Sequence, residues 1–279
     1  MAKLISRLTL SIGVLTIIFA SLSLINNDES NKVLYQASAS ESISIDDKKS
    51  YYLRADAPEP PEISANSYIV ADLLTGDVLI QKSSEEIHPI ASVSKLVTAL
   101  VALELKLTES DLLYPLLLES SNKTAEDIAG LLDRKSFIKS MNNYVARLGM
   151  LQTHFVDPSG LSVKNVSSAN DLLTLTRYIY KQQPDLLALT LVPQKQISKK
   201  EWQNNNLFVQ ERHRDYLGGK SGYTPEAGST LVSVFALPLV GQELRTVVII
   251  LLGTDSERGV KYEVAQNIID YVVANVYYK

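Results

Sequence analysis

The stretch Ala91-Ser92-Val93-Ser94-Lys95 is followed by an apolar run from Leu96 to Val101. We interpret it as a serine nucleophile at the mouth of a helix. Residues three apart lie on the same face of a helix, so the hydroxyl of Ser92 and the amine of Lys95 are expected side by side. Serine needs an adjacent base to attack a carbonyl, and a desolvated lysine can be that base. Serine is also a common helix N-cap, so this position alone leaves both interpretations open.

The S-x-x-K pattern occurs twice more, at 120–123 and 136–139. The copy at 136–139 falls at the solvated start of a predicted helix, which explains it as a capped helix with an exposed lysine. The copy at 120–123 falls in a break between two predicted helices, so Ser120 and Lys123 do not share a helical face. Ser92 and Lys95 therefore remain the candidate nucleophile and base.

Composition limits the chemistry that is available. The 279 residues are 46% hydrophobic, enough for one large domain or two small ones. A net charge of -4 gives no argument for a nucleic-acid partner. Since there are no cysteines, disulfides, thiolate metal sites and cysteine nucleophiles are excluded. The histidines do not form H-E-x-x-H, and we expect neither a metal nor a cofactor.

The first 63 residues indicate where in the cell the protein is placed and contain no candidate catalytic residue. Lys3 and Arg7 precede the apolar stretch 8–25, so residues 1–25 are a signal anchor or a signal peptide, and we favour an uncleaved anchor. The basic residues on its amino side place the remainder of the chain outside the cytoplasm. Residues 26–63 are polar and close with Pro58-Glu59-Pro60-Pro61, which predicts a disordered linker.

The folded domain is expected over residues 64–279, with strands at both ends and helices between them. Strands 68–72 and 78–81 flank a tight turn, and the uninterrupted apolar run 247–252 suits a strand that is covered on both faces. Helices are expected at 92–107, 108–119, 124–132, 136–148, 168–183 and 260–276, and further strands at 229–237 and 244–252. This order predicts an α/β (α+β) fold, an antiparallel sheet flanked by helices plus a helical cluster, with a cleft between sheet and cluster.

Two more motifs can supply partners for Ser92. Gly219-Lys220-Ser221-Gly222 places a lysine and a hydroxyl at the start of a strand, between glycines that let a ligand approach. The triplet Ser120-Ser121-Asn122 lies in the helix break. S-x-N also occurs at 64, 140 and 168, but only the copy at 120 lies in a helix-to-helix loop after the Ser92 helix and before the single K-S-G.

In this order S-x-x-K, S-x-N and K-S-G resemble the motifs of the penicillin-recognising serine enzymes. The closer resemblance is to D-alanyl-D-alanine carboxypeptidases, the low-molecular-mass penicillin-binding proteins of the β-lactamase/transpeptidase-like superfamily. Further landmarks that carry this resemblance are Pro89 to Ser92, Leu148-Gly149-Met150, Asp157-Pro158-Ser159-Gly160-Leu161 and Gly219 to Thr224. It implies that residues 64–279 are a catalytic domain with that fold.

The resemblance implies roles for individual residues. Ser92 would attack the terminal D-Ala-D-Ala bond of a peptidoglycan stem peptide and form an acyl-serine that water hydrolyses. Lys95 would be the base, kept neutral by burial and by the charge of Lys220, and Ser120 would pass a proton to the departing amine. The implied substrate-binding residues are Asn122, Lys220, Ser221, Gly222, Tyr223 and Thr224, with Arg258 as a further carboxylate candidate. The backbone N–H groups of Ser92 and Tyr223 would form the oxyanion hole.

The same resemblance implies that β-lactam antibiotics are covalent inhibitors and that the protein works in the bacterial cell envelope, anchored to the cytoplasmic membrane by residues 8–25. Only 24 residues separate Lys95 from Ser120, so a segment that usually lines part of the cleft is expected to be missing. A DD-endopeptidase, a transpeptidase, a β-lactamase and a catalytically silent peptidoglycan-binding module remain as alternatives. A Ser-His-Asp hydrolase is disfavoured because there is no G-x-S-x-G elbow.

Overall fold

A computed structural model describes residues 51–107, 110–240, 244–254 and 259–278. The predicted membrane segment, residues 26–50 of the predicted linker and Arg258 lie outside these ranges. Within them, no helix combines the length and the apolar character that crossing a membrane requires.

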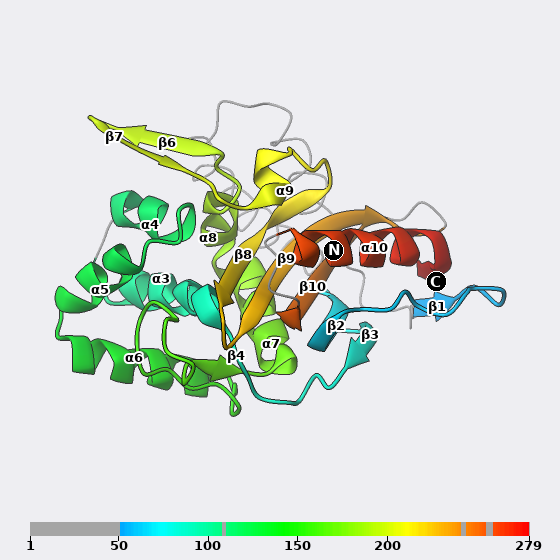
Figure 1. Cartoon of the computed structure of the whole chain (residues 1–279), viewed down its shortest axis with the longest axis horizontal. Helices are drawn as coiled ribbons and strands as arrows, with labels where there is room; N and C mark the ends of the chain where they lie inside the picture. Colours follow the sequence, from blue (N-terminus) through cyan, green and yellow to red (C-terminus); the bar gives the residue numbers. More distant parts are fainter. Residues whose placement is uncertain (1–50, 108–109, 241–243, 255–258, 279) are drawn as a thin grey trace, which may run out of the picture. The chain divides into compact units, whose positions relative to one another are not determined.

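A five-stranded antiparallel sheet forms the centre of the domain (Figure 1). Its strands lie in the order β3-β2-β10-β9-β8. They are β2 (Ala65–Asp72), β3 (Val78–Lys82), β8 (Tyr216–Thr224), β9 (Gly228–Pro238) and β10 (Leu244–Thr254). The predicted hairpin of β2 and β3 and the predicted pair of β9 and β10 are confirmed.

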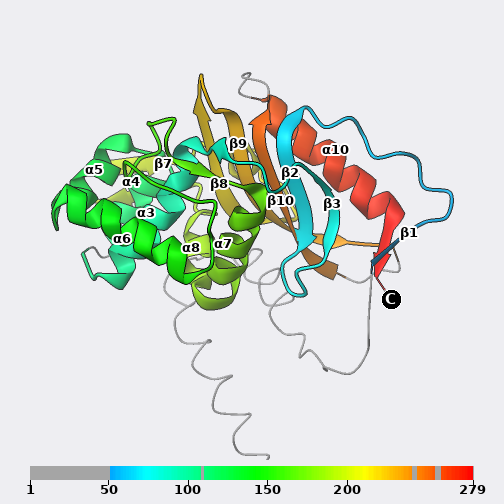
Figure 2. The ribbon, with the colours of Figure 1, turned by 90° about the horizontal axis from the view of Figure 1, so that it is seen from below.

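The sheet is covered on both faces, which explains the apolar run in β10. Val248, Ile250 and Leu252 pack into a core shared with the helical cluster. The alternate residues Val247, Ile249 and Leu251 pack into a second core under α10 (Val260–Asn275). Because successive side chains of a strand point to opposite faces, a central strand between two cores has apolar side chains on both faces, here from Val247 to Leu252. Figure 2 shows α10 on one side of the sheet and the cluster on the other.

The helical cluster surrounds α3, which is buried on all sides. We expected a helix over residues 92–107. Instead a 3-10 turn, η2 (Ala91–Ser94), precedes α3 (Lys95–Glu104), and every residue of α3 from Lys95 to Ala102 is buried. The other helices of the cluster are α4 (Ser110–Leu117), α5 (Asn122–Gly130), α6 (Arg134–Arg147), α7 (Ala169–Gln182) and α8 (Pro184–Leu189).

Three short strand pairs and a short helix complete the domain. β4 (His88–Pro89) pairs with β5 (Val166–Ser167) just before η2. A hairpin of β6 (Gln194–Ile197) and β7 (Lys200–Gln203), which the sequence analysis did not predict, leads to α9 (Leu207–Gln210). β1 (Tyr51–Leu53) pairs with β11 (Val276–Tyr278), at opposite ends of the described chain.

Strand β1 corrects the prediction that residues 26–63 are a disordered linker throughout. The Tyr51 hydroxyl donates a hydrogen bond to the buried carboxylate of Asp72 at the end of β2. That carboxylate also forms an ion pair with Arg245 of β10, with 2.7 Å between Oδ2 and Nη2. Composition did not reveal the strand because its partners, β11 and Asp72, lie far from it in the sequence.

The Asp72 and Arg245 pair generates a prediction about stability. In Asp72→Asn the buried Arg245 guanidinium loses the charge of Asp72, and breaking a buried pair in this way costs about 3–5 kcal/mol. We therefore expect Asp72→Asn to lower the free energy of unfolding by that amount in urea titrations. The matched control is Asp127→Asn, which breaks the exposed pair with Lys123 and should cost about 0.5 kcal/mol or less. Equal losses in the two variants would contradict the prediction.

Candidate active site

Ser92 and Lys95 are in contact, as the sequence analysis predicted, although the local geometry differs from a helix cap. Ser92 lies within η2, where no side chain caps the turn. Its Oγ is 2.9 Å from Nζ of Lys95, the first residue of α3. The Ser92 hydroxyl therefore does not act as a helix cap but faces the Lys95 amine.

Lys95 is completely buried, and its amine is held by three oxygens. Besides contacting Ser92, Nζ donates to Oδ1 of Asn122 at 2.7 Å and to the backbone carbonyl of Ser159 at 2.5 Å. An amide oxygen and a carbonyl can only accept, so these contacts require two N–H groups of the amine. A hydroxyl can also donate. The arrangement therefore fits a neutral amine whose lone pair accepts the proton of Ser92.

Burial lowers the pKa of Lys95 from 10.5 to about 7, against the opposing effect of the Asp157 carboxylate. We expected the charge of Lys220 to contribute to this shift. The shift comes from burial instead, and the pKa of Lys220 is itself lowered well below 10.5, by burial first and then by Lys95 and Lys261. Desolvation of Lys95 is thus the main cause of a neutral amine near neutral pH.

Two glycines let the backbone close tightly around Ser92. Gly160 has φ of +83° and lies so close to Ala91 that a Cβ would be 1.9 Å from the Ala91 carbonyl oxygen. A Cβ on Gly222 would lie 2.7 Å from the backbone nitrogen of Ser92. Only glycine permits such approaches. This gives a physical reason for the glycines in D-P-S-G and in K-S-G.

Ser120 combines backbone strain with an unsatisfied hydroxyl. It lies between α4 and α5 with φ of +61°, a conformation that non-glycine residues seldom adopt. Its Oγ is buried and has no hydrogen-bond partner among the described residues. The next residue, Ser121, caps α5 by accepting from the Thr124 N–H. A strained residue with an orphaned polar atom is typical of functional sites.

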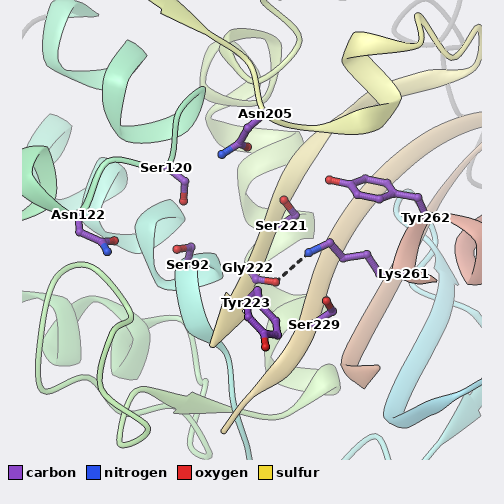
Figure 3. A pocket seen from close by; sticks show the side chains of 10 residues that line it. All are labelled: Ser92, Ser120, Asn122, Asn205, Ser221, Gly222, Tyr223, Ser229, Lys261 and Tyr262. Carbon is purple, nitrogen blue, oxygen red and sulfur yellow. Dashed lines mark hydrogen bonds between the residues drawn. The ribbon is translucent and has the colours of Figure 1, made fainter. Parts of the chain in front are cut away.

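A cavity of about 380 Å³ brings most of the predicted site together (Figure 3). Its lining includes six residues that the sequence analysis singled out: Ser92, Ser120, Asn122, Ser221, Gly222 and Tyr223. They come from η2, from the loop before α5 together with the start of α5, and from the edge strand β8. The cavity thus lies between the sheet and the helical cluster, where the cleft was predicted.

The remaining predicted residues lie outside the cavity lining. Lys95 is buried behind Ser92. Lys220 is buried in β8, where Nζ donates to the Ser221 carbonyl at 2.7 Å. Thr224 ends β8, and its hydroxyl accepts from the Ala227 N–H. In the described part of the chain, no three His, Asp or Glu side chains gather as a metal-binding group.

Sequence reasoning missed four residues that line the cavity, namely Asn205, Ser229, Lys261 and Tyr262. Lys261 is the most informative of them, because it is a buried cation whose Nζ donates to the Gly222 carbonyl at 3.0 Å (Figure 3). A lysine in the first turn of a helix gives no local signal of a role in the site. Only the packing of α10 against the sheet brings it to the cavity.

Fold and cavity define an active-site serine peptidase of the penicillin-binding type. The chain matches the family described as D-alanyl-D-alanine carboxypeptidase, peptidase family S11, over residues 54–106 and 103–249. The chain belongs to this family. The two matched segments meet at residues 103–106, inside the short connection between Lys95 and Ser120.

Individual relatives carry two different names. A D-alanyl-D-alanine endopeptidase of Pseudomonas aeruginosa is 30% identical, across 64% of this chain and 69% of the relative. The D-alanyl-D-alanine carboxypeptidase DacD of Escherichia coli is 27% identical, across 73% and 62%. Among solved structures, cefotaxime-bound penicillin-binding protein D2 of Listeria monocytogenes has a TM-score of 0.67 and 25% identity, covering 77% of this chain and all but 1% of that one.

The buried amine predicts a pH-dependent stability. The unfolded chain holds the Lys95 proton up to about pH 10.5, whereas the folded chain releases it near 7. Between these values the unfolded state binds more protons, so stability from this group rises with pH, by up to about 1.4 kcal/mol per unit. Lys95→Met lacks this dependence. We expect the stability of the variant relative to wild type to be highest at pH 7 and to fall towards pH 9 in urea titrations.

The control for this measurement is Lys139→Met, which replaces the exposed lysine of another S-x-x-K copy. Its stability relative to wild type should not change between pH 7 and pH 9. If Lys95→Met is equally independent of pH, burial does not perturb the Lys95 amine.

Proposed function

We propose that this chain is a serine-type D-Ala-D-Ala carboxypeptidase that trims peptidoglycan stem peptides, with Ser92 as nucleophile, Lys95 as base and Ser120 as proton relay. The observation that carries the proposal is the 2.9 Å contact between Ser92 Oγ and the fully buried amine of Lys95. A serine is activated when a neighbouring base can take its proton, and burial makes this lysine such a base.

Acylation begins when the Lys95 amine accepts the Ser92 proton and Oγ attacks the carbonyl of the penultimate D-Ala. The negative charge that develops on the carbonyl oxygen is stabilised by the backbone N–H groups of Ser92 and Tyr223. The close approach of Gly222 to the Ser92 nitrogen supports this pairing. As the peptide bond breaks, the proton passes through the Ser120 hydroxyl to the departing amine, and D-Ala leaves.

Deacylation reverses these proton transfers, with water as the nucleophile. Lys95 returns to its neutral form once the proton has left with D-Ala, so the same amine can take a proton from the incoming water. Attack of this water on the acyl-serine ester releases the shortened peptide and restores the Ser92 hydroxyl. The Asn122 side-chain oxygen and the Ser159 carbonyl, which the reaction does not change, keep the amine in place through both half-reactions.

The substrate lies along β8 in this proposal. Asn122 holds the peptide backbone from the helical side, while Gly222 and Tyr223 hold it from the strand. The terminal carboxylate is bound by Lys220, Ser221 and Thr224, and we add Lys261, which lines the same cavity. A bound carboxylate raises the pKa of a neighbouring lysine, so substrate would oppose the lowering of the Lys220 pKa that burial causes.

Endopeptidase activity is the second candidate function. Its support is that the similar relatives of Pseudomonas aeruginosa, Haemophilus influenzae and Escherichia coli, 30%, 34% and 31% identical, are named D-alanyl-D-alanine endopeptidases. The short connection between Lys95 and Ser120 is consistent with a cleft that admits a larger leaving amine. Both activities use the same acyl-serine, so the distinction depends on which leaving groups the cleft accepts.

The proposal extends to inhibitors and location. β-Lactams would acylate Ser92 as covalent inhibitors, supported by the cefotaxime-bound state of the similar Listeria protein. The enzyme would act outside the cytoplasm in the bacterial cell envelope, held to the membrane by residues 8–25. The alternative is a catalytically silent module of the same fold that only binds peptidoglycan, and covalent labelling distinguishes it from an enzyme.

Labelling with a fluorescent penicillin tests the nucleophile. We expect wild type to take one label and Ser92→Ala to take none, because no other hydroxyl contacts the Lys95 amine among the described residues. Ser136→Ala, which removes the serine of another S-x-x-K copy, should label like wild type. Wild type that takes no label would favour the silent module, and labelling of Ser92→Ala would mean that another serine reacts.

Product analysis separates the two peptidase activities. The full chain is incubated with a pentapeptide ending in D-Ala-D-Ala and, separately, with a cross-linked stem-peptide dimer. We expect free D-Ala from the pentapeptide at a rate at least ten times the rate of dimer cleavage, with both activities absent in Ser92→Ala. Faster cleavage of the dimer would identify an endopeptidase, and formation of new dimers a transpeptidase.

A further inference from the structure

The loop that carries Ser120 is held from outside its own helices. Carbonyls at the end of a helix have no partner within the helix and need one elsewhere. Here the carbonyl of Leu118 accepts from the backbone N–H of Asn205, and the carbonyl of Glu119 accepts from the Asn205 side-chain amide, both at 3.0 Å. Both bonds end within two residues of the strained Ser120.

Asn205 belongs to the triplet Asn204-Asn205-Asn206, which connects β7 to α9 and has no helix or strand of its own. The Asn204 side-chain amide donates to the carbonyls of Thr190, at 2.8 Å, and Val192, at 3.0 Å. Its Oδ1 accepts from the N–H of Asn206 at 3.0 Å. Buried side-chain amides that bond to backbone in this way fix the course of an irregular segment.

The same network reaches the opposite wall of the cavity. The hydroxyl of Thr190 accepts from the N–H of Gly219 at 2.9 Å, immediately before Lys220 in β8. A continuous set of hydrogen bonds and short backbone links thus joins the Ser120 loop to the strand that carries K-S-G. Asn205 and Ser120 both line the cavity (Figure 3).

We propose that Asn205 is a positioning residue for acylation: its side-chain amide holds the Glu119 carbonyl and thereby keeps the Ser120 hydroxyl directed into the cavity. This inference rests on the proposed role of Ser120 as proton relay. A residue with φ of +61° stays in that conformation only if its surroundings fix it. The Ser120 hydroxyl makes no hydrogen bond that could do so. The backbone on either side of it does: the Ser121 N–H donates to the Pro115 carbonyl at 3.0 Å, and Asn205 holds the Glu119 carbonyl.

The test uses the full chain and two substitutions. Asn205→Ala removes the side-chain donor, and Asn205→Asp replaces it with an oxygen that faces the Glu119 carbonyl and cannot donate. Both keep the backbone bond to Leu118. We expect each to slow acylation by a fluorescent penicillin at least tenfold, with the loss in the rate at saturating penicillin rather than in the concentration that gives half saturation.

Stability is measured in parallel by thermal unfolding. Asn275→Ala is the control, because it also removes an amide-to-carbonyl bond, from Asn275 to Tyr271 at the end of α10. It should lose as much thermal stability as Asn205→Ala while its acylation rate stays within twofold of wild type. If Asn275→Ala slows acylation as strongly, the effect of Asn205 is a general loss of stability and the proposal is wrong.

A double-mutant cycle with Ser120→Ala decides whether Asn205 acts through Ser120. If it does, adding Asn205→Ala to Ser120→Ala slows acylation no further, because there is no hydroxyl left to position. If the double variant is instead slowed by the product of the two single-variant rate reductions, the inference is overturned. Wild-type acylation in Ser120→Ala would refute the proposed relay instead, and slow acylation in Ser120→Ala with normal acylation in Asn205→Ala would refute the positioning role alone.

Discussion

Burial of the Lys95 amine is the constraint on which the rest of the site depends. A lysine in water is protonated at neutral pH and cannot act as a base. Here three segments supply oxygens to one nitrogen: the adjoining turn of Ser92 and, from far along the chain, the start of α5 at Asn122 and the loop at Ser159. Each oxygen satisfies a polar group that would otherwise be expensive to bury. The helix that starts at Lys95 is correspondingly enclosed by the cluster on every side.

Enclosing that helix forces its neighbours into unusual backbone conformations. Ala91 has φ of +46° beside Ser92, and Ser120 has φ of +61° across the cavity. Gly160 and Gly222 pack against the turn of Ser92 at distances that leave no room for a side chain. Strain of this kind persists where the surrounding structure fixes it. The two cores on either side of the sheet, together with the amides of the asparagine triplet, provide this rigidity.

Much of the architecture could be predicted because local patterns depend on burial. The apolar run in β10 indicated a strand between two cores, and the hairpin of β2 and β3 followed from its turn. The start of the central helix was misplaced because a 3-10 turn and the first turn of an α-helix have the same sequence pattern. Strand β1 was missed since its partner lies at the other end of the chain. Lys261 and Asn205 gave no local signal, because their significance comes only from what packs against them.

The sequence by itself determined which serine and lysine lie together. Ser92 and Lys95 are three residues apart, and this spacing brings their side chains together in any helical turn, whether 3-10 or α. Their order relative to Ser120, Asn122 and Lys220 then distinguished one copy of S-x-x-K from the other two. Only the tertiary structure decided the lowered pKa of Lys95, the strain at Ser120 and the position of Lys261 at the cavity. Desolvation and close packing depend on residues distant in sequence, so no local pattern encodes them.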